Sequence, residues 1–253
     1  MQNTLKKKLG NGESAIGAWI SSGSPNLVDL LRKLNFDWFV FDMEHSAISI
    51  ETVGRMIQVL NGSTITPLVR VGQIDQAVLK VVLDSGAQGV VVPLVNTVEE
   101  AERAVRFCKY PPQGVRGVAA TKASDYGMSL SNYIRTANEE TAIIAQIETP
   151  QAVDNIKEIL SVKGVDVAFV GPSDLTMTMG LMDDRSNPKV TEAMLKVLKA
   201  CQDAGKTAGT MATSLDETKF AVQRGFRFIS LASEMRFATM GARAFLEAAG
   251  RQS

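Results

Sequence analysis

Eight short apolar runs alternate with longer amphipathic segments, and this alternation restricts the fold more than any other feature of the chain. The runs cover residues 15–20, 37–42, 66–71, 88–95, 142–148, 165–171, 207–212 and 226–233. Between them, segments such as 149–160 and 188–205 carry apolar residues at helical spacing. Several of these segments open with Ser, Thr or Pro and close on Gly or Asn, which are typical helix start and stop residues. We therefore expect eight strands, each followed by helix.

Strands that are apolar on both faces and alternate with helices indicate a parallel sheet covered by helices. Eight such units predict a (β/α)8 TIM barrel of the α/β class. An open doubly wound sheet is the alternative, but no G-x-G-x-x-G turn follows the first strand run. Such barrels often form one domain of about 250 residues, so residues 1–253 are predicted to be a single domain.

One segment breaks this rhythm: residues 110–141 form a long excursion between the fourth and fifth runs. Connections of this length in a compact domain are usually functional or contain short helices of their own. We interpret the excursion as a lid or an oligomer contact.

Composition excludes several classes of function. The 27 basic residues balance the 27 acidic ones, so no net field attracts nucleic acid or an anionic membrane. Cys108 and Cys201 lie far apart and form neither a disulfide framework nor a metal cluster, which fits a reducing cytoplasm. No export signal or apolar stretch of about 18 residues is evident. A cytoplasmic protein without nucleic-acid or membrane partners is expected.

Ionisable or amide side chains end four of the predicted strands, at the edge that carries the active site in TIM barrels. They are Asp42, Glu44 and His45 after the second strand, Arg70 after the third, Gln146 and Glu148 after the fifth, and Asp174 after the sixth. Charged groups at the ends of buried strands are costly unless they are paired or bind a metal. A structural ion pair between Arg70 and Glu148, plugging the barrel mouth, is the alternative to a functional site.

Glu148 and Asp174 supply two carboxylates without a second His or a Cys nearby, so a hard cation such as Mg²⁺ or Mn²⁺ is expected rather than zinc. The sequence GPSDL at 171–175 also opens a helix, whose first N–H groups favour a bound carboxylate. Such a site suits a 2-oxo acid that chelates the cation through its carboxylate and keto oxygens.

A cation that holds a 2-oxo acid acidifies the carbon next to the keto group, and a base is then required. His45 is the only histidine, and imidazole titrates near neutral pH, so it is the candidate base, oriented by Asp42 or Asp84. Arg70 stays protonated and suits a developing oxyanion. The alternative Schiff-base route needs a desolvated lysine at a strand's carboxyl end, and Lys122 in the excursion is the only loose candidate.

Five motifs, "FDMEHS", "PLVRV", "YPPQGVRGV", "AQIET" and "FVGPSDL", occur in this order and together resemble the metal-dependent class II pyruvate aldolases of the HpcH/HpaI family. That family includes 4-hydroxy-2-oxoheptanedioate and 2-keto-3-deoxy sugar-acid aldolases. The resemblance implies a phosphoenolpyruvate/pyruvate-type TIM barrel and an aldehyde-lyase. The implied reaction is the reversible cleavage of a 4-hydroxy-2-oxo acid to pyruvate and an aldehyde through a metal-stabilised pyruvate enolate.

The resemblance also implies roles for individual residues. His45 would be the general base, Asp84 would raise its basicity and Arg70 would stabilise the oxyanion. Glu148 and Asp174 would hold Mg²⁺ or Mn²⁺, with Co²⁺ as a further candidate and no organic cofactor. The predicted substrate-binding residues are Trp19, Gln146, Gly171, Pro172 and Ser173. A homohexamer is implied too, in which a carboxyl-terminal helix at 234–249 packs on a neighbouring subunit; a helix that covers its own barrel would have the same sequence pattern.

Three departures from the family pattern leave the aldehyde open. Lys122 stands where relatives have an arginine, "TKASDYG" is shorter than its counterpart, and Glu234 replaces a more usual aspartate. Other functions are weighed against the aldolase. A citramalyl- or malyl-CoA-type lyase lacks an evident basic cradle for CoA, and a glycosidase using Glu148 has few aromatic residues for sugar stacking. A non-catalytic barrel is the last alternative.

Overall fold

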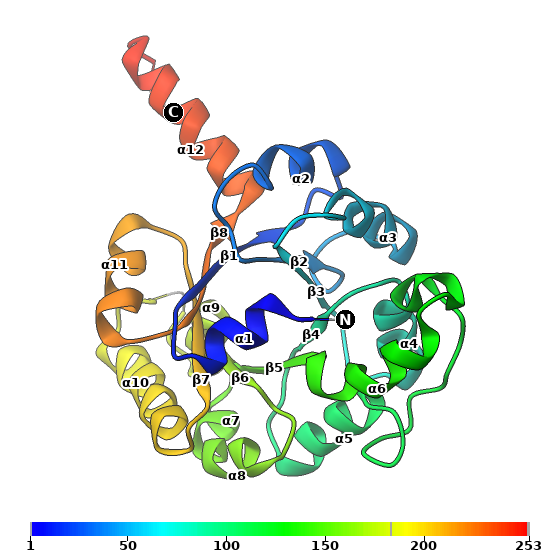
Figure 1. The fold of residues 1–253 in the computed structure, drawn as a ribbon. Coiled ribbons are helices and arrows are strands. Elements are labelled where there is room, and N and C mark those ends of the chain that lie inside the picture. Colours follow the sequence, from blue (N-terminus) through cyan, green and yellow to red (C-terminus); the bar gives the residue numbers. More distant parts are fainter. Residues whose placement is uncertain (1, 183, 252–253) are drawn as a thin grey trace.

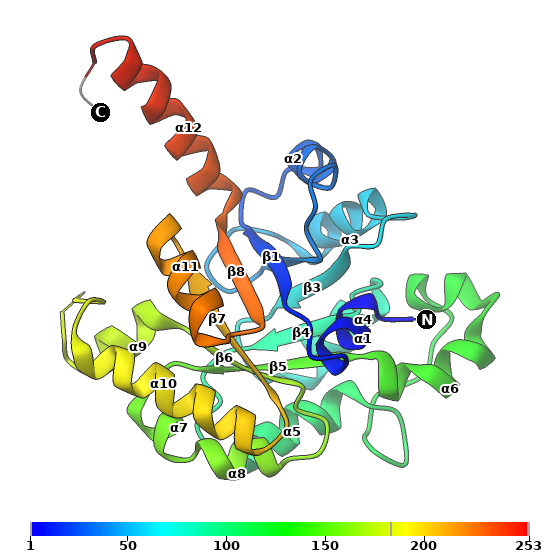
Figure 2. The same ribbon diagram turned by 60° about the vertical axis from the view of Figure 1, so that its left-hand side comes forward.

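The computed structural model of the protein describes residues 2–182 and 184–251, and its centre is a closed barrel of eight parallel strands ringed by helices (Figures 1 and 2). The strands are β1 (Ala15–Ile20), β2 (Trp38–Asp42), β3 (Thr66–Arg70), β4 (Gly89–Val92), β5 (Ala142–Ile147), β6 (Val167–Val170), β7 (Thr207–Ala212) and β8 (Phe228–Ser233). Each strand pairs with the next, and β8 pairs with β1. All eight predicted strands and the TIM barrel are confirmed.

The helices lie on the outside of the barrel and follow the predicted segments. They are α1 (Thr4–Gly10), α2 (Pro25–Leu31), α3 (Ile50–Val59), α4 (Gln76–Asp84), α5 (Val98–Cys108), α6 (Leu130–Glu140), α7 (Pro150–Asp154), α8 (Ile156–Ser161), α9 (Pro172–Thr178), α10 (Pro188–Asp203), α11 (Leu215–Arg224) and α12 (Glu234–Ala248). Ser24, Ser49 and Thr97 cap α2, α3 and α5 by accepting a backbone N–H in the first turn. One expected helix, 149–160, is divided into α7 and α8 at Asn155.

The barrel interior is filled by large side chains that point inward from alternate strand positions. Trp38 stacks on Phe228 with ring centroids 4.1 Å apart. Trp38 fits because Gly17 on β1 has no side chain: a Cβ there would lie 2.1 Å from the indole ring. The packed rings leave no pore, so any site has to lie at an end of the barrel.

Helix α1 closes the amino-terminal end of the barrel, across which it lies in Figure 1. Leu5 and Leu9 join the cluster of side chains inside the barrel. The buried Asn3 amide donates to the carbonyl oxygens of Gln88 (2.9 Å) and Glu140 (2.8 Å), which fixes the start of the helix. The polar strand ends identified above therefore meet at the opposite, carboxyl-terminal end.

The excursion at 110–141 contains the 3-10 helix η1 (Lys122–Gly127) and α6, so the expected short helices are confirmed. Its anchor is Arg116, whose buried guanidinium binds Asp84 at the end of α4 (2.7 Å) and the Tyr133 hydroxyl (3.1 Å). η1 packs against α4 and faces residues 86–88, which directly precede β4. This part of the excursion lies beside the amino ends of the strands and does not cover the carboxyl ends; an oligomer contact stays a prediction.

Helix α12 extends away from the barrel (Figures 1 and 2). Its apolar side chains Met235, Met240, Phe245 and Leu246 are exposed, Phe245 to 81%. The helix therefore does not cover its own barrel, and its expected packing on a neighbouring subunit remains a prediction. Among the described residues, no helix combines the length and apolar character needed to span a membrane.

Candidate active site

Arg70 is held at the carboxyl end of β3 by two carboxylates and an indole ring. The parallel register places Asp42 beside it, and the Arg70 guanidinium donates to both Asp42 oxygens, from Nε at 2.9 Å and from Nη2 at 2.7 Å. Nη1 lies 2.9 Å from Glu44 Oε2, and the guanidinium carbon sits 5.4 Å from the centre of the Trp19 ring. Bidentate pairing and stacking fix the guanidinium plane. Arg70 is thus a positioned cation at the barrel mouth.

Asp42 shapes the turn after β2 but does not bind the His45 ring. Its Oδ1 accepts the backbone N–H groups of Glu44 (3.0 Å) and His45 (3.3 Å). The His45 side chain is 65% exposed, and its Nε2 lies 3.9 Å from Glu44 Oε2. The expectation that Asp42 orients the imidazole is corrected: Asp42 positions the backbone of His45, because its carboxylate is taken up by Arg70 and the turn. Glu44, left unassigned by the sequence, pairs with Arg70.

Asp84 is not brought to His45 within the chain. It is the last residue of α4, which ends shortly before β4 begins, whereas His45 follows the carboxyl end of β2. The Asp84 carboxylate instead accepts a hydrogen bond from Arg116 at 2.7 Å. For a single chain this corrects the expected contact between Asp84 and His45, since helix α4 runs back to the amino end of the barrel before it reaches Asp84.

Glu148 is buried at the end of β5 without a cationic partner. Its Oε1 accepts the Leu94 N–H (2.8 Å) and its Oε2 accepts the Gln146 amide (2.6 Å). No lysine or arginine among the described residues lies within ion-pair distance of it, so the alternative plug between Arg70 and Glu148 is not formed. Burial raises the pKa of Glu148, and nearby Asp174 adds to the rise against the opposing effect of the two hydrogen bonds and Arg70.

Gly171 lies between Glu148 and Asp174 and leaves a small space that both carboxylates face. A Cβ built at Gly171 would stand 3.1 Å from Glu148 Oε2 and 3.6 Å from Asp174 Oδ2. Pro172 is buried at the start of α9, while Ser173 and Asp174 are exposed in its first turn. Two oxygen ligands from different elements therefore approach one point.

The surroundings of this point fit a divalent cation and an oxygen-rich ligand. Two buried polar atoms, Gln146 Oε1 and Trp19 Nε1, have no hydrogen-bond partner, although buried polar groups are normally paired. The described residues contain no group of three or more His, Cys, Asp and Glu side chains placed to bind a metal. The protein would thus supply two carboxylates, as Mg²⁺ or Mn²⁺ accepts when water and substrate oxygens complete the shell.

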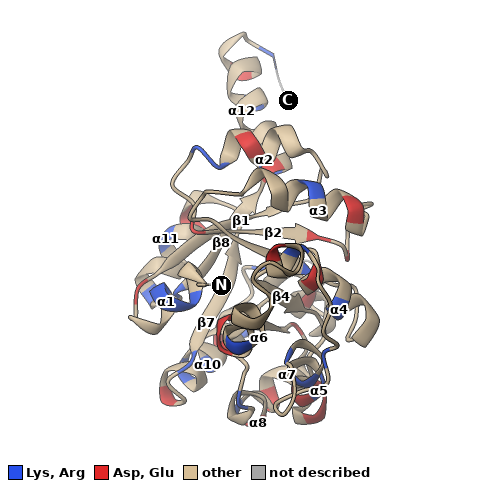
Figure 3. Ribbon diagram, turned by 45° about the vertical axis from the view of Figure 1, so that its right-hand side comes forward, with Lys and Arg blue, Asp and Glu red and all other residues tan. Residues whose placement is uncertain are grey.

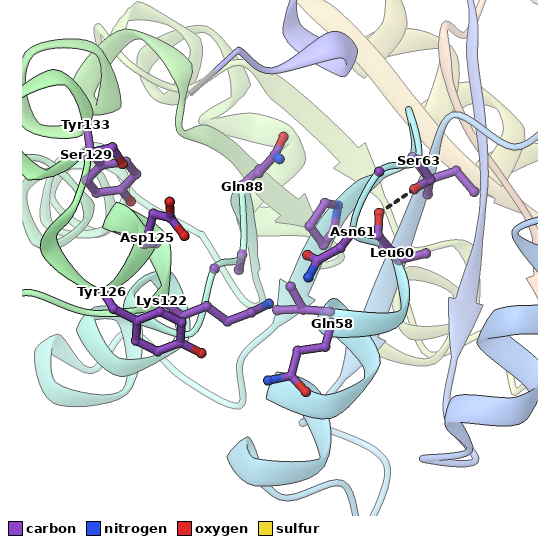
Figure 4. A pocket seen from close by; sticks show the side chains of 17 residues that line it. Gln58, Leu60, Asn61, Ser63, Gln88, Lys122, Asp125, Tyr126, Ser129 and Tyr133 are labelled. Atoms are coloured by element: carbon purple, nitrogen blue, oxygen red, sulfur yellow. Dashed lines mark hydrogen bonds between the residues drawn. The ribbon is translucent and has the colours of Figure 1, made fainter.

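Lys122 lies elsewhere, in a cavity of about 660 Å³ between the excursion and the end of α3 (Figure 4). Gln58, Asn61, Gln88 and Tyr126 also line it. Burial lowers the pKa of Lys122. Because the cavity is bordered by residues that precede β3 and β4, this lysine belongs to the amino-terminal side of the barrel. The chain does not bring it to the carboxylates, so the Schiff-base alternative gains no support.

Two contributors to the mouth, Leu94 and Phe169, were missed from the sequence, and Glu234 was noted there only as a departure from the family pattern. Leu94 has a positive φ of 51° and offers only its backbone N–H, for which the sequence has no signal. Phe169 stacks under Trp19 with ring centroids 5.3 Å apart; its place two residues before Gly171, on the same face of β6, was a usable signal. Glu234 accepts the N–H groups of Ser21 (2.7 Å) and Ser22 (2.5 Å) and so ties the end of β8 to the loop after β1.

Comparisons with known proteins show the family to which the chain belongs. The sequence model of the family described as HpcH/HpaI aldolase/citrate lyase matches residues 15–239. The hydroxypyruvate/pyruvate aldolase of Roseobacter denitrificans is 35% identical over 92% of this chain and 91% of its own. The 2-keto-3-deoxy-L-rhamnonate aldolase of Escherichia coli K12 is 32% identical over 91% and 87%. An HpcH/HpaI aldolase/citrate lyase family structure from Burkholderia cenocepacia superposes with a TM-score of 0.95 at 32% identity, covering 98% of this chain and 99% of the other.

Relatives named as aldolases thus align with nearly the whole chain, and aldolases are carbon–carbon lyases. We conclude that the chain is a carbon–carbon lyase of the HpcH/HpaI aldolase/citrate lyase family.

Proposed function

We propose that the protein is a divalent-metal-dependent aldolase that reversibly cleaves a 4-hydroxy-2-oxo acid to pyruvate and an aldehyde. The observation that carries the proposal is the pair Glu148 and Asp174, which face one point beside Gly171 and have no cationic partner among the described residues. Leaving two such carboxylates uncompensated costs free energy unless a cation binds them. The names of the relatives, pyruvate and sugar-acid aldolases, agree with this choice of reaction.

Glu148 and Asp174 are the proposed ligands of Mg²⁺ or Mn²⁺, with Co²⁺ as a further candidate. When bound there, the cation would withdraw electron density from the keto group of a 2-oxo acid and so acidify the adjacent carbon. Gln146 Oε1 and Trp19 Nε1 are unpartnered acceptor and donor atoms at the floor of the same mouth. They, with the backbone at Gly171 and Pro172 and the Ser173 hydroxyl, are proposed to orient pyruvate.

His45 is proposed to be the base. In the cleavage direction it takes the proton from the 4-hydroxyl group, the bond between C3 and C4 breaks, and the aldehyde leaves. The electron pair remains on the pyruvate fragment as its enolate, and a proton then returns to its methyl carbon. Arg70, fixed by Asp42 and Glu44, is proposed to donate to the oxygen that carries the developing negative charge. The exposed imidazole can exchange its proton with solvent.

Proton exchange at pyruvate tests the proposal without knowledge of the aldehyde. With Mn²⁺ in deuterium oxide, the methyl protons of pyruvate should be replaced by deuterium, as seen by proton NMR, and EDTA should stop the exchange. His45→Ala should slow it about a hundredfold or more while Mn²⁺ still binds. Absence of exchange in the presence of metal, or exchange that survives EDTA, would refute the mechanism. A stable adduct with borohydride would instead point to a lysine.

The natural aldehyde is the open half of the substrate. Pyruvate and Mn²⁺ supplied with a panel of short aldehydes, including hydroxylated and carboxylated ones, should yield a new 4-hydroxy-2-oxo acid with at least one of them. Product identification by mass spectrometry and NMR defines the acceptor class. A homohexamer built through α12 and a cytoplasmic location remain part of the same proposal, and analytical ultracentrifugation of the full chain against a chain truncated before α12 tests the former.

A further inference from the structure

A second cavity, of about 490 Å³, lies at the amino-terminal end of the barrel, opposite the mouth. It is enclosed by α1 and the turn after it on one side and by the residues that lead into β6, β7 and β8 on the other. The charged side chains that line it are Lys6, Asp166, Lys206 and Arg227. No step of the proposed reaction uses any of them.

The single acid of this cavity is already engaged. Asp166 Oδ1 forms an ion pair with Lys6 at 2.8 Å, and both side chains are only about a quarter exposed, at 24% and 23%. Asp166 Oδ2 accepts the backbone N–H of Ile143 at 2.9 Å. The carboxylate therefore has a partner on each oxygen and leaves the other two cations of the cavity uncompensated.

Among the described residues, the Lys206 and Arg227 side chains donate hydrogen bonds to backbone carbonyl groups and not to a carboxylate. The Lys206 ammonium donates to the Val165 carbonyl oxygen at 2.7 Å, and the Arg227 guanidinium donates weakly to the Lys206 carbonyl oxygen at 3.4 Å. Within the described ranges, no carboxylate lies within 4 Å of either group. Both cations are only partly exposed and line the same cavity, where charges are screened less than in bulk water.

A further lysine, Lys109, lies near Lys6 at the amino-terminal end of the barrel. The buried Lys109 donates to the Thr141 carbonyl oxygen at 3.2 Å, and Lys6 donates to the same oxygen at 3.4 Å. Burial, and to a smaller extent the neighbouring Lys6, lowers the pKa of Lys109 against the opposing effect of Asp166. Lys109 lies beside Lys6 but does not itself line the cavity.

We propose that this cavity binds a small dianion, a phosphate group, between Arg227, Lys206 and Lys6. Arginine presents a planar fork of donors and lysine a point charge, a combination that recognises phosphate oxygens. The volume also admits the phosphate of a small monoester. The bound anion joins α1, which closes the barrel, to the starts of β7 and β8. Binding is therefore expected to stabilise the fold at the end opposite the catalytic site.

Isothermal titration of the full chain with inorganic phosphate, at constant ionic strength set with chloride, tests the inference. The wild-type chain should bind phosphate, and Arg227→Gln and Lys206→Gln should each weaken the affinity about tenfold or more. Lys7→Gln is the matched control, because Lys7 is the exposed neighbour of Lys6 on α1 and does not line the cavity; its affinity should equal that of the wild type. Equal affinities of Arg227→Gln and Lys7→Gln would overturn the proposal.

Two further arms place and identify the anion. If Arg70→Lys abolishes phosphate binding while Arg227→Gln does not, the anion sits at the barrel mouth and the proposal is wrong. Titration with glycerol phosphate then separates the two sources of the group: tighter binding than that of inorganic phosphate identifies a monoester, and equal or weaker binding identifies the free ion. None of these measurements depends on aldolase activity.

Discussion

The two ends of the barrel carry opposite imbalances of charge. At the carboxyl end, Glu148 and Asp174 approach one point with no lysine or arginine of the described residues in ion-pair contact, while Arg70 is bound by Asp42 and Glu44. In the amino-terminal cavity, Lys206 and Arg227 have no carboxylate within 4 Å among the described residues, while Asp166 is bound by Lys6. Figure 3 shows acidic and basic residues interspersed on the surrounding helices, and the chain as a whole is neutral. A neutral net charge is thus compatible with one group of unpaired acids and one group of unpaired bases. The first favours a bound cation and the second a bound anion.

A structural ion pair and an ion-binding site differ in whether each charged side chain has a partner of opposite charge. Where a carboxylate already holds an arginine in a bidentate bond, as Asp42 holds Arg70, the pair is complete and serves to position the cation. Where two neighbouring side chains have the same charge, their repulsion and desolvation lower the stability of the fold. A bound ion of opposite charge removes this penalty. This distinction can be tested by substitutions at each end of the barrel.

Glu148→Gln should have the largest effect, because it removes a carboxylate ligand while keeping the shape and the hydrogen bond acceptor for Leu94. We expect the exchange of pyruvate methyl protons to fall about a thousandfold, with weaker Mn²⁺ binding by titration calorimetry. The same substitution at Glu44 keeps both proposed metal ligands and should leave Mn²⁺ affinity within a few-fold. Equal loss of Mn²⁺ binding in the two variants would show that the two carboxylates do not form the site.

Leu5→Ala should lower the thermal stability of the protein without changing the site at the barrel mouth. Leu5 is almost fully buried beneath the barrel, and truncating a buried leucine typically costs about 2–4 kcal/mol. For a chain of this size we expect thermal unfolding roughly 5–12 °C lower. Leu30→Ala, at an exposed leucine of α2, is the control and should change the unfolding temperature little. Affinity for Mn²⁺ measured below the transition should stay unchanged in both variants; a parallel loss would mean that the two ends are coupled.

Gly171→Ala should have a moderate effect that is specific to the mouth. The backbone there suits any residue, with φ at −91°, but the new methyl group would lie 3.1 Å from Glu148 Oε2. The carboxylate has to shift by a few tenths of an ångström, and Mn²⁺ affinity should fall about tenfold. Gly54→Ala on α3, where an added Cβ meets nothing within 4 Å, is the matched control. An unchanged affinity in Gly171→Ala would place the metal elsewhere.

The smallest effect concerns pH. Burial raises the pKa of Glu148, and burial likewise raises that of Glu44. In the metal-free protein these groups favour folding when protonated, and that contribution is lost as pH rises through their raised pKa values. Mn²⁺ compensates the charge, so its stabilising effect should be a few degrees larger at about pH 7.5 than at about pH 5 in thermal shift assays. Glu148→Gln should lose most of this difference; a shift independent of pH would contradict it.

The sequence predicted the fold and which residues lie at the barrel mouth, because both follow from the pattern of apolar and polar residues along each strand. Buried strands read as apolar runs, and the residues that end them, such as Arg70 and Glu148, necessarily meet at one end of a closed parallel barrel. The expected residues Gln146, Gly171 and Asp174 are accordingly found together there.

The predictions that were wrong concern the hydrogen-bond partners of individual side chains. Asp42 could have oriented the His45 ring or bound Arg70, and only the register of β2 and β3 decides for Arg70. Asp84 was assigned to His45 although α4 carries it to the other end, where Arg116 from the excursion binds it. Likewise, the role of Leu5 in closing the barrel has no local signal, since a basic helix on the surface would look the same. Contacts of long sequence separation set all three.

The two tryptophans of the chain differ in their surroundings. Trp38 stacks on Phe228 and donates a hydrogen bond to the Ala15 carbonyl oxygen, and its ring centre lies 6.1 Å from that of Trp19. Trp19 lies beneath the Arg70 guanidinium with its indole N–H free. Because indole fluorescence responds to nearby charge and hydrogen bonding, the mouth of this barrel contains an intrinsic fluorophore for its own occupancy, without any label.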